Sequence, residues 1–184
     1  MTGRSFRSPV HAAVGLFVAW VIHDLEEAMT MPATADRLAS RLDHSPRSWV
    51  RLLARHTRMD GRRATLAIAL MGVLVAAATV HGIATDGRSR FFQYVLAGLH
   101  GHVCTHVGLS LRLRGYTSGV FTALAVMAPY SRAARRALRD AQILIEGPRP
   151  YVLGAVILLP AALASHVIAE VLVRHRTWWT SGES

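Results

Sequence analysis

Lysine is absent from this 184-residue chain, so all 21 basic residues are arginines, which stand against 11 acidic residues and give a formal net charge of +10. The single cysteine, Cys104, excludes an internal disulfide and a cysteine-rich zinc site. Charged residues make up only 17% of the chain and hydrophobic residues 52%, which is too apolar for an ordinary soluble domain. The sequence therefore predicts that residues 1–184 form one domain in a lipid bilayer.

Sequence motifs of several common functions are also missing. The chain has no G-x-S-x-G nucleophile elbow, no phosphate-binding loop and no dinucleotide fingerprint. Its positive charge is not accompanied by zinc-finger spacing, an RNA-binding signature or a basic recognition helix, so nucleic acid is not an expected partner. The arginines concentrate instead between apolar runs, above all in residues 32–63 and 132–149. Arginines beside membrane spans attract anionic headgroups, so membrane lipids are the expected partner.

Long apolar runs predict an all-α integral membrane bundle of about five transmembrane helices. Four runs reach the length of about 20 residues that a hydrocarbon core of roughly 30 Å requires. They cover residues 10–31, 64–84, 91–113 and 151–173. A fifth run at 116–130 lies between Gly115 and Pro129 and either crosses the membrane or re-enters it. Amphipathic segments that begin at Ser48 and that cover residues 131–146 predict one or two further helices on the membrane surface.

Three of the predicted spans contain ionisable residues, although each such residue costs at least about 2.5–3.5 kcal/mol on insertion. The first span carries HDLEE at 23–27, the third carries HGHVCTH at 100–106, and the last carries SHVIAE at 165–170. Residues three or four positions apart share a helix face, so each helix presents a pair of metal-ligand types. The predicted ligands are His23, Glu26, Glu27, His102, His106, His166 and Glu170.

The depth of these pairs along the bilayer supports a common site. With five crossings the first, third and fifth spans run in the same direction, and their pairs begin within about 6 Å of one another at 1.5 Å per residue. Only an odd number of crossings brings His166 to the level of His23. His81 falls near the opposite surface because the second span runs the other way. His100 projects away from His102 on the helical wheel, so we interpret it as a packing residue.

Imidazoles and carboxylates together suit iron, zinc or manganese, and the lack of thiolates argues against copper(I) and iron–sulfur centres. Seven candidate ligands exceed the needs of one tetrahedral zinc ion. The sequence therefore favours two divalent ions, of iron or zinc, that are bridged by Glu26 or Glu27, the two predicted catalytic residues.

Three functions remain open at this point. The first is a membrane metalloenzyme that acts on a lipid or another hydrophobic small molecule, with a di-iron hydroxylase or desaturase favoured over a zinc-type hydrolase. The second is a transporter or channel for metal ions or protons, in which intramembrane histidines and glutamates line a path. The third is a structural membrane subunit without metal, in which the same pairs are hydrogen-bonded clamps between helices.

The motif His23-x-x-Glu26-Glu27 resembles the signature of the HXXEE family of small bacterial membrane proteins. Later blocks follow in the same order, namely His102-x-x-x-His106, GYTSGVFTALAVMAPYS at 115–131 and His166-x-x-x-Glu170. The resemblance covers most of the chain, from about residue 10 to 172. It implies a multi-pass protein of the bacterial cytoplasmic membrane and marks His23, Glu26 and Glu27 as the defining site. The family is one of unknown function, so the resemblance implies no reaction.

Overall fold

The computed structural model describes residues 8–49, 51 and 60–180. These ranges are all-α, with no strand among the described residues, so the all-α part of the predicted fold class is confirmed. The elements are α1 (Pro9–Asp43), α3 (Gly61–Ala84), α4 (Arg90–Leu113), α5 (Val120–Thr122), the π-helix η1 (Ala123–Met127), α6 (Ala128–Asp140) and α7 (Arg149–Thr180). Most of the predicted surface helix that begins at Ser48 lies outside the described residues.

Side-chain caps fix where three of the helices begin. Ser8, Asp60 and Ser89 each accept a hydrogen bond from the backbone N–H three residues later, at 3.4, 2.8 and 3.3 Å. Such a cap satisfies a donor that the helix itself leaves unpaired, and it stabilises the helix by about 1 kcal/mol. α1, α3 and α4 therefore begin within a few residues of the predicted spans at 10, 64 and 91.

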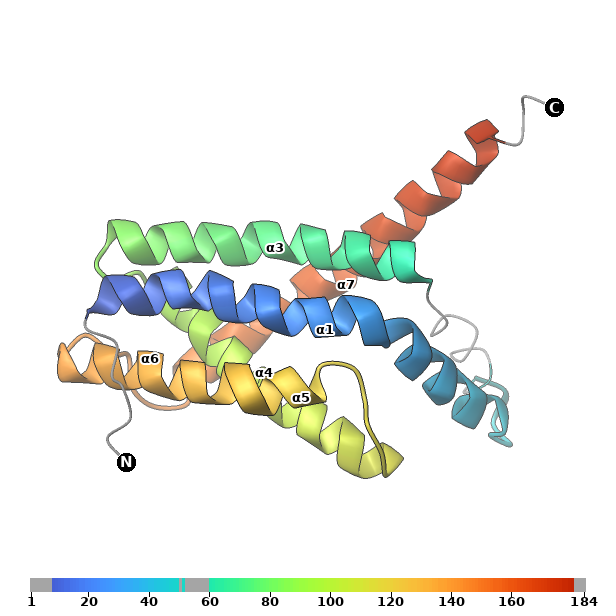
Figure 1. The fold of residues 1–184 in the computed structure, drawn as a ribbon, viewed down its shortest axis with the longest axis horizontal. Helices are drawn as coiled ribbons and strands as arrows, with labels where there is room; N and C mark the ends of the chain where they lie inside the picture. The colour runs from blue at the N-terminus through green and yellow to red at the C-terminus, as the bar shows by residue number, and fades with distance from the viewer. Residues whose placement is uncertain (1–7, 50, 52–59, 181–184) are drawn as a thin grey trace.

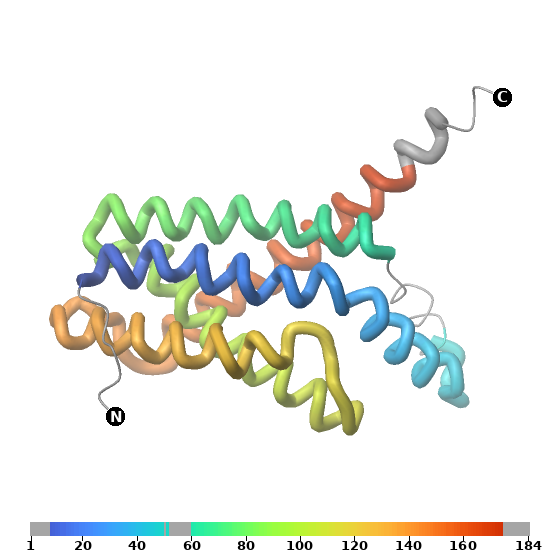
Figure 2. The backbone as a smooth tube through the Cα atoms, viewed as in Figure 1, coloured from blue at the N-terminus to red at the C-terminus, as the bar shows by residue number. Residues whose placement is uncertain are grey.

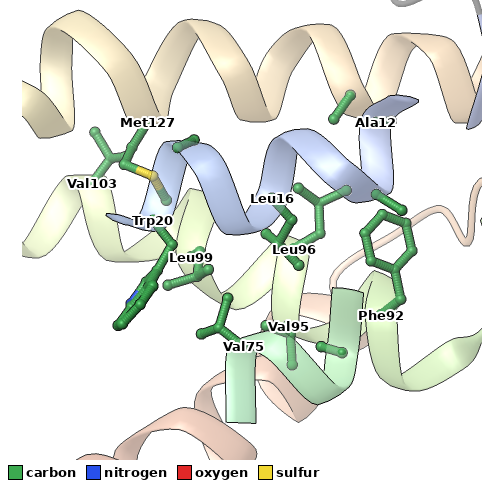
Figure 3. Packing of buried hydrophobic residues seen from close by; sticks show 14 of the residues in the cluster. Ala12, Leu16, Trp20, Val75, Phe92, Val95, Leu96, Leu99, Val103 and Met127 are labelled. Carbon is green, nitrogen blue, oxygen red and sulfur yellow. The ribbon is translucent and has the colours of Figure 1, made fainter. Parts of the chain in front are cut away.

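The helices form an up-and-down bundle (Figure 1). α1, α4 and α7 run in one direction, and α3 and α6 run in the other. α1 packs against α3 and α6, while α7 packs against α3 and α4. Figure 3 shows the core between them, to which α1 contributes Leu16, α3 contributes Val75, and α4 contributes both Phe92 and Leu96. The parallel course of α1, α4 and α7 is the arrangement that the depth comparison requires.

α1 extends well beyond the predicted span, which ended at residue 31. Pro32 lies inside the helix, where it removes one backbone hydrogen bond. The tube in Figure 2 changes direction along the last part of α1, as expected near an internal proline. The helix resumes because Ala35 and Ala39 bury their side chains against the rest of the protein.

The predicted fifth run at 116–130 does not form one straight helix. Its first residues are a loop that ends at Gly119, whose φ is +76°. From Val120 the chain is helical through α5, η1 and α6 to Asp140. The predicted surface helix at 131–146 is therefore the second half of this run. It packs against α1 and buries Ala134 and Leu138, so it belongs to the bundle.

Among the described residues, two helices are long and apolar enough to cross a membrane. They are α3, over Gly61–Ala84, and α7, over Arg149–Arg174. α1 and α4 have comparable or greater length. They carry the histidines and acids of the predicted site, and these side chains lower their mean hydropathy.

Candidate metal centre

Four of the predicted ligands converge between α1 and α4. They are His23 and Glu27 of α1 and His102 and His106 of α4, and one ligand atom from each lies within 4.8 Å of all the others. The Nε2 atoms of His102 and His106 are 2.9 Å apart, and the Nε2 atom of His106 is 3.7 Å from Oε1 of Glu27. Both pairs have the spacing of four residues that places side chains on one face of a helix. We call these four residues the His–Glu cluster.

The Nδ1 atoms of His23 and His106 form hydrogen bonds with the segment that precedes α6. Nδ1 of His106 lies 2.9 Å from the backbone carbonyl oxygen of Ser118, which can only accept a hydrogen bond. Nδ1 of His23 lies 3.0 Å from Oγ1 of Thr122. The hydroxyl of Thr122 donates its one hydrogen to Oε2 of Glu26 at 2.5 Å, so it must accept from His23. Both imidazoles therefore carry a proton on Nδ1.

His102 follows the same pattern within its own helix. Its Nδ1 lies 2.9 Å from Oγ1 of Thr105, and that hydroxyl donates to the backbone carbonyl of His102 at 2.7 Å. All three neutral imidazoles thus direct the unshared electron pair of Nε2 into the cluster. Nε2 of His23 is buried and has no hydrogen-bond partner among the described residues. A buried acceptor without a partner is costly, so this atom calls for a cation or a hydrogen-bond donor.

The donor set fits a divalent metal ion. Two unprotonated nitrogens 2.9 Å apart, those of His102 and His106, repel each other unless a cation lies between them. Nitrogen ligands lie about 2.0–2.1 Å from zinc, and two such ligands at a right angle are about 2.9 Å apart. Three imidazoles and one carboxylate suit zinc, iron or manganese. The donor types and the spacing of the His–Glu cluster therefore suit one such ion.

Gly119 covers the cluster on the side of the loop. A Cβ atom at this position would lie 2.7 Å from Cε1 of His106, 2.9 Å from Cε1 of His23 and 3.0 Å from Cγ of Glu27. Only glycine allows the backbone to lie this close, and its positive φ also favours glycine. The loop therefore closes this face of the cluster with main chain. We call residues 116–122 the cap.

A cavity of about 230 Å³ lies beside the cluster, between α1, α3, α4 and α7. Its polar lining includes His23, Glu27 and His102 together with Asp24 and His166. The remaining walls are almost entirely apolar and are formed by Trp20, Met31, Ala67, Ile68, Met71, Leu99, Leu158, Leu159 and Ala162. The cluster is therefore covered by main chain at the cap and adjoins an apolar chamber at the cavity.

Three predicted ligands lie outside the cluster. The carboxylate of Glu26 accepts hydrogen bonds from the cap, from the hydroxyl of Tyr116 among others. Glu170 forms ion pairs of 2.9 Å with Arg63 and with Arg174. His166 lines the cavity but is not one of the four clustered donors.

Asp24 was not among the predicted ligands, although it belongs to the HDLEE segment. Its side chain is 7% exposed and lines the cavity next to the cluster. The prediction selected residues three or four positions from a histidine, and Asp24 is only one position from His23, which is about 100° around the helix.

His81 and His100, which were not predicted to be ligands, lie away from the cluster. His81 is exposed and meets the ring of Phe91 edge-on, with centroids 5.8 Å apart. Nδ1 of His100 lies 2.6 Å from Oγ of Ser131, which donates to the backbone carbonyl of Met127 in η1. Neither belongs to the His–Glu cluster.

Fold and site together define an all-α bundle with a cluster of three histidines and one glutamate between two parallel helices. The chain belongs to the HXXEE family, because a family model described as "Protein of unknown function with HXXEE motif" matches residues 14–134. The expected family is thereby confirmed, and the match contains the whole cluster and the cap. It ends before His166 and Glu170. No curated protein and no solved structure matches this chain.

Proposed function

We propose that this protein is a multi-pass membrane metalloenzyme that binds one divalent metal ion in the His–Glu cluster and acts on a hydrophobic substrate in the adjoining cavity. The observation that carries the proposal is the convergence of three Nε2 electron pairs and the Glu27 carboxylate beside an apolar chamber. The sequence favoured two ions, but a dinuclear centre would need more carboxylates. Glu26 and Glu170 use theirs on other partners, so the four clustered donors account for one ion.

Apolar side chains on the outer surface support a bilayer environment. The exposed face of α1 carries Val14, Val18, Ile22, Leu25 and Met29. The exposed face of α7 carries Val152, Val156, Leu159, Leu163 and Val167. A soluble monomer rarely exposes contiguous apolar faces of this extent. Lipid on these faces would let α1 cross together with α3 and α7, although α1 carries His23, Asp24 and Glu27 on its inner side.

The cavity supports a substrate that dissolves in the membrane. Leu159 lines the cavity and is also 64% exposed on the outer face of α7, so one wall of the cavity borders the lipid-facing surface. A molecule with a hydrocarbon body matches these walls. When bound, iron would supply oxygen activation and zinc would supply an activated water molecule.

Within the protein, Glu27 would hold the ion and Asp24 would offer a carboxylate at the edge of the cavity. Oxidation of a hydrocarbon chain suits apolar walls and is our first candidate reaction. Hydrolysis is the second, because a free carboxylate beside the ion can accept a proton from water.

The packing supports an enzyme over a conduction path. On the side of the cluster toward the start of α1, the bundle interior is filled by Leu16, Val75, Phe92 and Leu96 (Figure 3). A path for ions would need polar side chains or water through this layer. The ionisable groups instead gather at one level of the bundle, as expected for a reaction site.

Elemental analysis of the detergent-purified protein and of four variants tests the proposal. We expect about one metal ion per chain in the parent, which is the ratio that the four donors imply. Glu27→Gln and His102→Ala each remove a ligand and should lose the ion, whereas His81→Ala and His100→Ala serve as matched controls and should keep it.

Three outcomes would contradict the proposal in different ways. A parent protein that binds no iron, zinc or manganese would leave the cluster a structural clamp. A content of two ions per chain would restore the dinuclear hypothesis. If His81→Ala lost the ion as fully as Glu27→Gln did, the transporter hypothesis would take its place.

A further inference from the structure

We infer that Glu26 is a positioning residue: it anchors the cap over the His–Glu cluster and, through Thr122, holds His23 in the tautomer that directs Nε2 to the metal. This inference rests on the proposed metal centre. It gives Glu26, the first glutamate of the family motif, a role different from that of Glu27, although the two are adjacent in sequence.

The carboxylate of Glu26 is fully used by the cap. Oε1 accepts hydrogen bonds from the hydroxyl of Tyr116 and from the backbone N–H of Phe121, the latter at 3.3 Å. Oε2 accepts from the backbone N–H of Thr122 at 2.7 Å and from its hydroxyl at 2.5 Å. A carboxylate oxygen has two acceptor sites, so four donors leave none for a metal ion. All four donors come from the cap.

The hydroxyl of Thr122 links this anchor to the cluster. It gives its one hydrogen to Glu26 and receives the Nδ1 hydrogen of His23, so the direction of both hydrogen bonds is fixed. Without the hydroxyl, the buried Nδ1–H of His23 would lose its acceptor. The imidazole could then place its proton on Nε2, where it would compete with the metal. Partners of this kind behind a metal-bound histidine typically change metal affinity by about 10–100-fold.

The cap orients a second cluster histidine in the same way. The carbonyl oxygen of Ser118 accepts from Nδ1 of His106 at 2.9 Å. Ser118 is itself fixed to α1, because its backbone N–H donates to Oγ1 of Thr34 at 2.9 Å and its hydroxyl oxygen lies within hydrogen-bond distance, 2.9 Å, of the Thr30 hydroxyl. The cap is therefore attached to three positions of α1, at Glu26, Thr30 and Thr34. Two of the three histidines depend on it for their orientation.

Substitutions at Thr122 test the link without touching a ligand. Thr122→Val is nearly isosteric and removes only the hydroxyl, so we expect zinc affinity to fall by about 10–100-fold while the number of ions per chain is unchanged. Thr122→Ser restores the hydroxyl and should restore the affinity. Thr79→Val is the matched control, because the hydroxyl of Thr79 is equally buried but has no hydrogen-bond partner in the described part of the chain. Zinc affinity would be measured by competition with a chromophoric chelator in detergent.

Glu26→Gln separates a positioning role from ligation. The amide would present N–H groups to donors of the cap, so zinc affinity should fall to the same extent as in Thr122→Val. If Glu26 were a ligand, Glu26→Gln would lose zinc while Thr122→Val kept the parent affinity. That result would overturn the inference.

Heteronuclear NMR of isotope-labelled histidine gives a readout that does not depend on variants. We expect the His23 ring to carry its proton on Nδ1 in the metal-free protein and to bind zinc through Nε2. A His23 ring protonated on Nε2, or bound to zinc through Nδ1, would contradict the inference even if the cluster holds zinc. Failure of the proposed function would appear differently, as a parent protein without metal whose His23 is nonetheless protonated on Nδ1.

Discussion

Replacing Gly119 by alanine probes the contact between the cap and the cluster most directly. The new Cβ would lie within 3.0 Å of one atom in each of His23, Glu27 and His106, and all three atoms belong to side chains that the cluster holds in place. Overpacking of this kind costs about 1–3 kcal/mol. The positive φ of +76° adds about 1 kcal/mol for any residue with a Cβ. We expect Gly119→Ala to lower the free energy of unfolding by about 2–4 kcal/mol, the sum of these two effects.

Gly147→Ala separates the two costs. Gly147 has a similar φ of +86°, but a Cβ there would meet nothing within 4 Å. It should therefore show only the backbone cost of about 1 kcal/mol. The difference between the two variants measures the steric contact of the cap with the cluster.

Unfolding of both variants in detergent, with and without zinc, provides the assay. Saturating metal stabilises a folded state that binds it, by about 4.1 kcal/mol when its concentration is 1,000 times the Kd. Gly147→Ala should keep this increment. Gly119→Ala displaces the cap, and each tenfold loss of affinity should reduce the increment by about 1.4 kcal/mol. Equal unfolding free energies and equal zinc increments in the two variants would refute the close contact that the structure shows.

Two further substitutions test the neighbourhood of the site. Gly154→Ala should destabilise the protein by at least about 1–3 kcal/mol, because its Cβ would lie 2.7 Å from the backbone of Gly98 and force α4 and α7 apart. Thermal unfolding measures this loss, and Gly101→Ala, whose Cβ would lie 3.7 Å from Tyr151, is the control. Glu170→Gln should leave metal content unchanged by elemental analysis, since its carboxylate pairs with arginines, and a loss of the ion would return Glu170 to the ligand set.

Helical spacing was enough to find the residues of the cluster. His23 with Glu27 and His102 with His106 are four apart, and four residues on a helix return to the same face whatever the tertiary structure. Their common level required only that α1 and α4 run in parallel, which follows from one intervening antiparallel helix. Hydrophobic patterning gave that order of helices before any packing was known.

The same spacing did not distinguish Glu26 from Glu27. Both lie within one turn of His23, so both were predicted to bind metal. Their roles separate only through what covers each face of α1, and the cap comes from a segment about 90 positions away in sequence. Glu170 shows the same limit. Its predicted depth along the bilayer matched that of His23, but its side chain forms an ion pair with Arg63 at the start of the antiparallel α3.

The family motif and the cap form one physical unit, and both lie within the residues that the family model matches. His23 and Glu27 contribute two donors, and the intervening Glu26 is turned aside on the helix toward the cap. The cap in turn needs Gly119 to approach the donors and Thr122 to complete the link to His23. All of these residues lie within residues 14–134. α7 lies beyond that range and contributes a wall of the cavity. The matched region therefore contains all four residues of the His–Glu cluster and the cap over them.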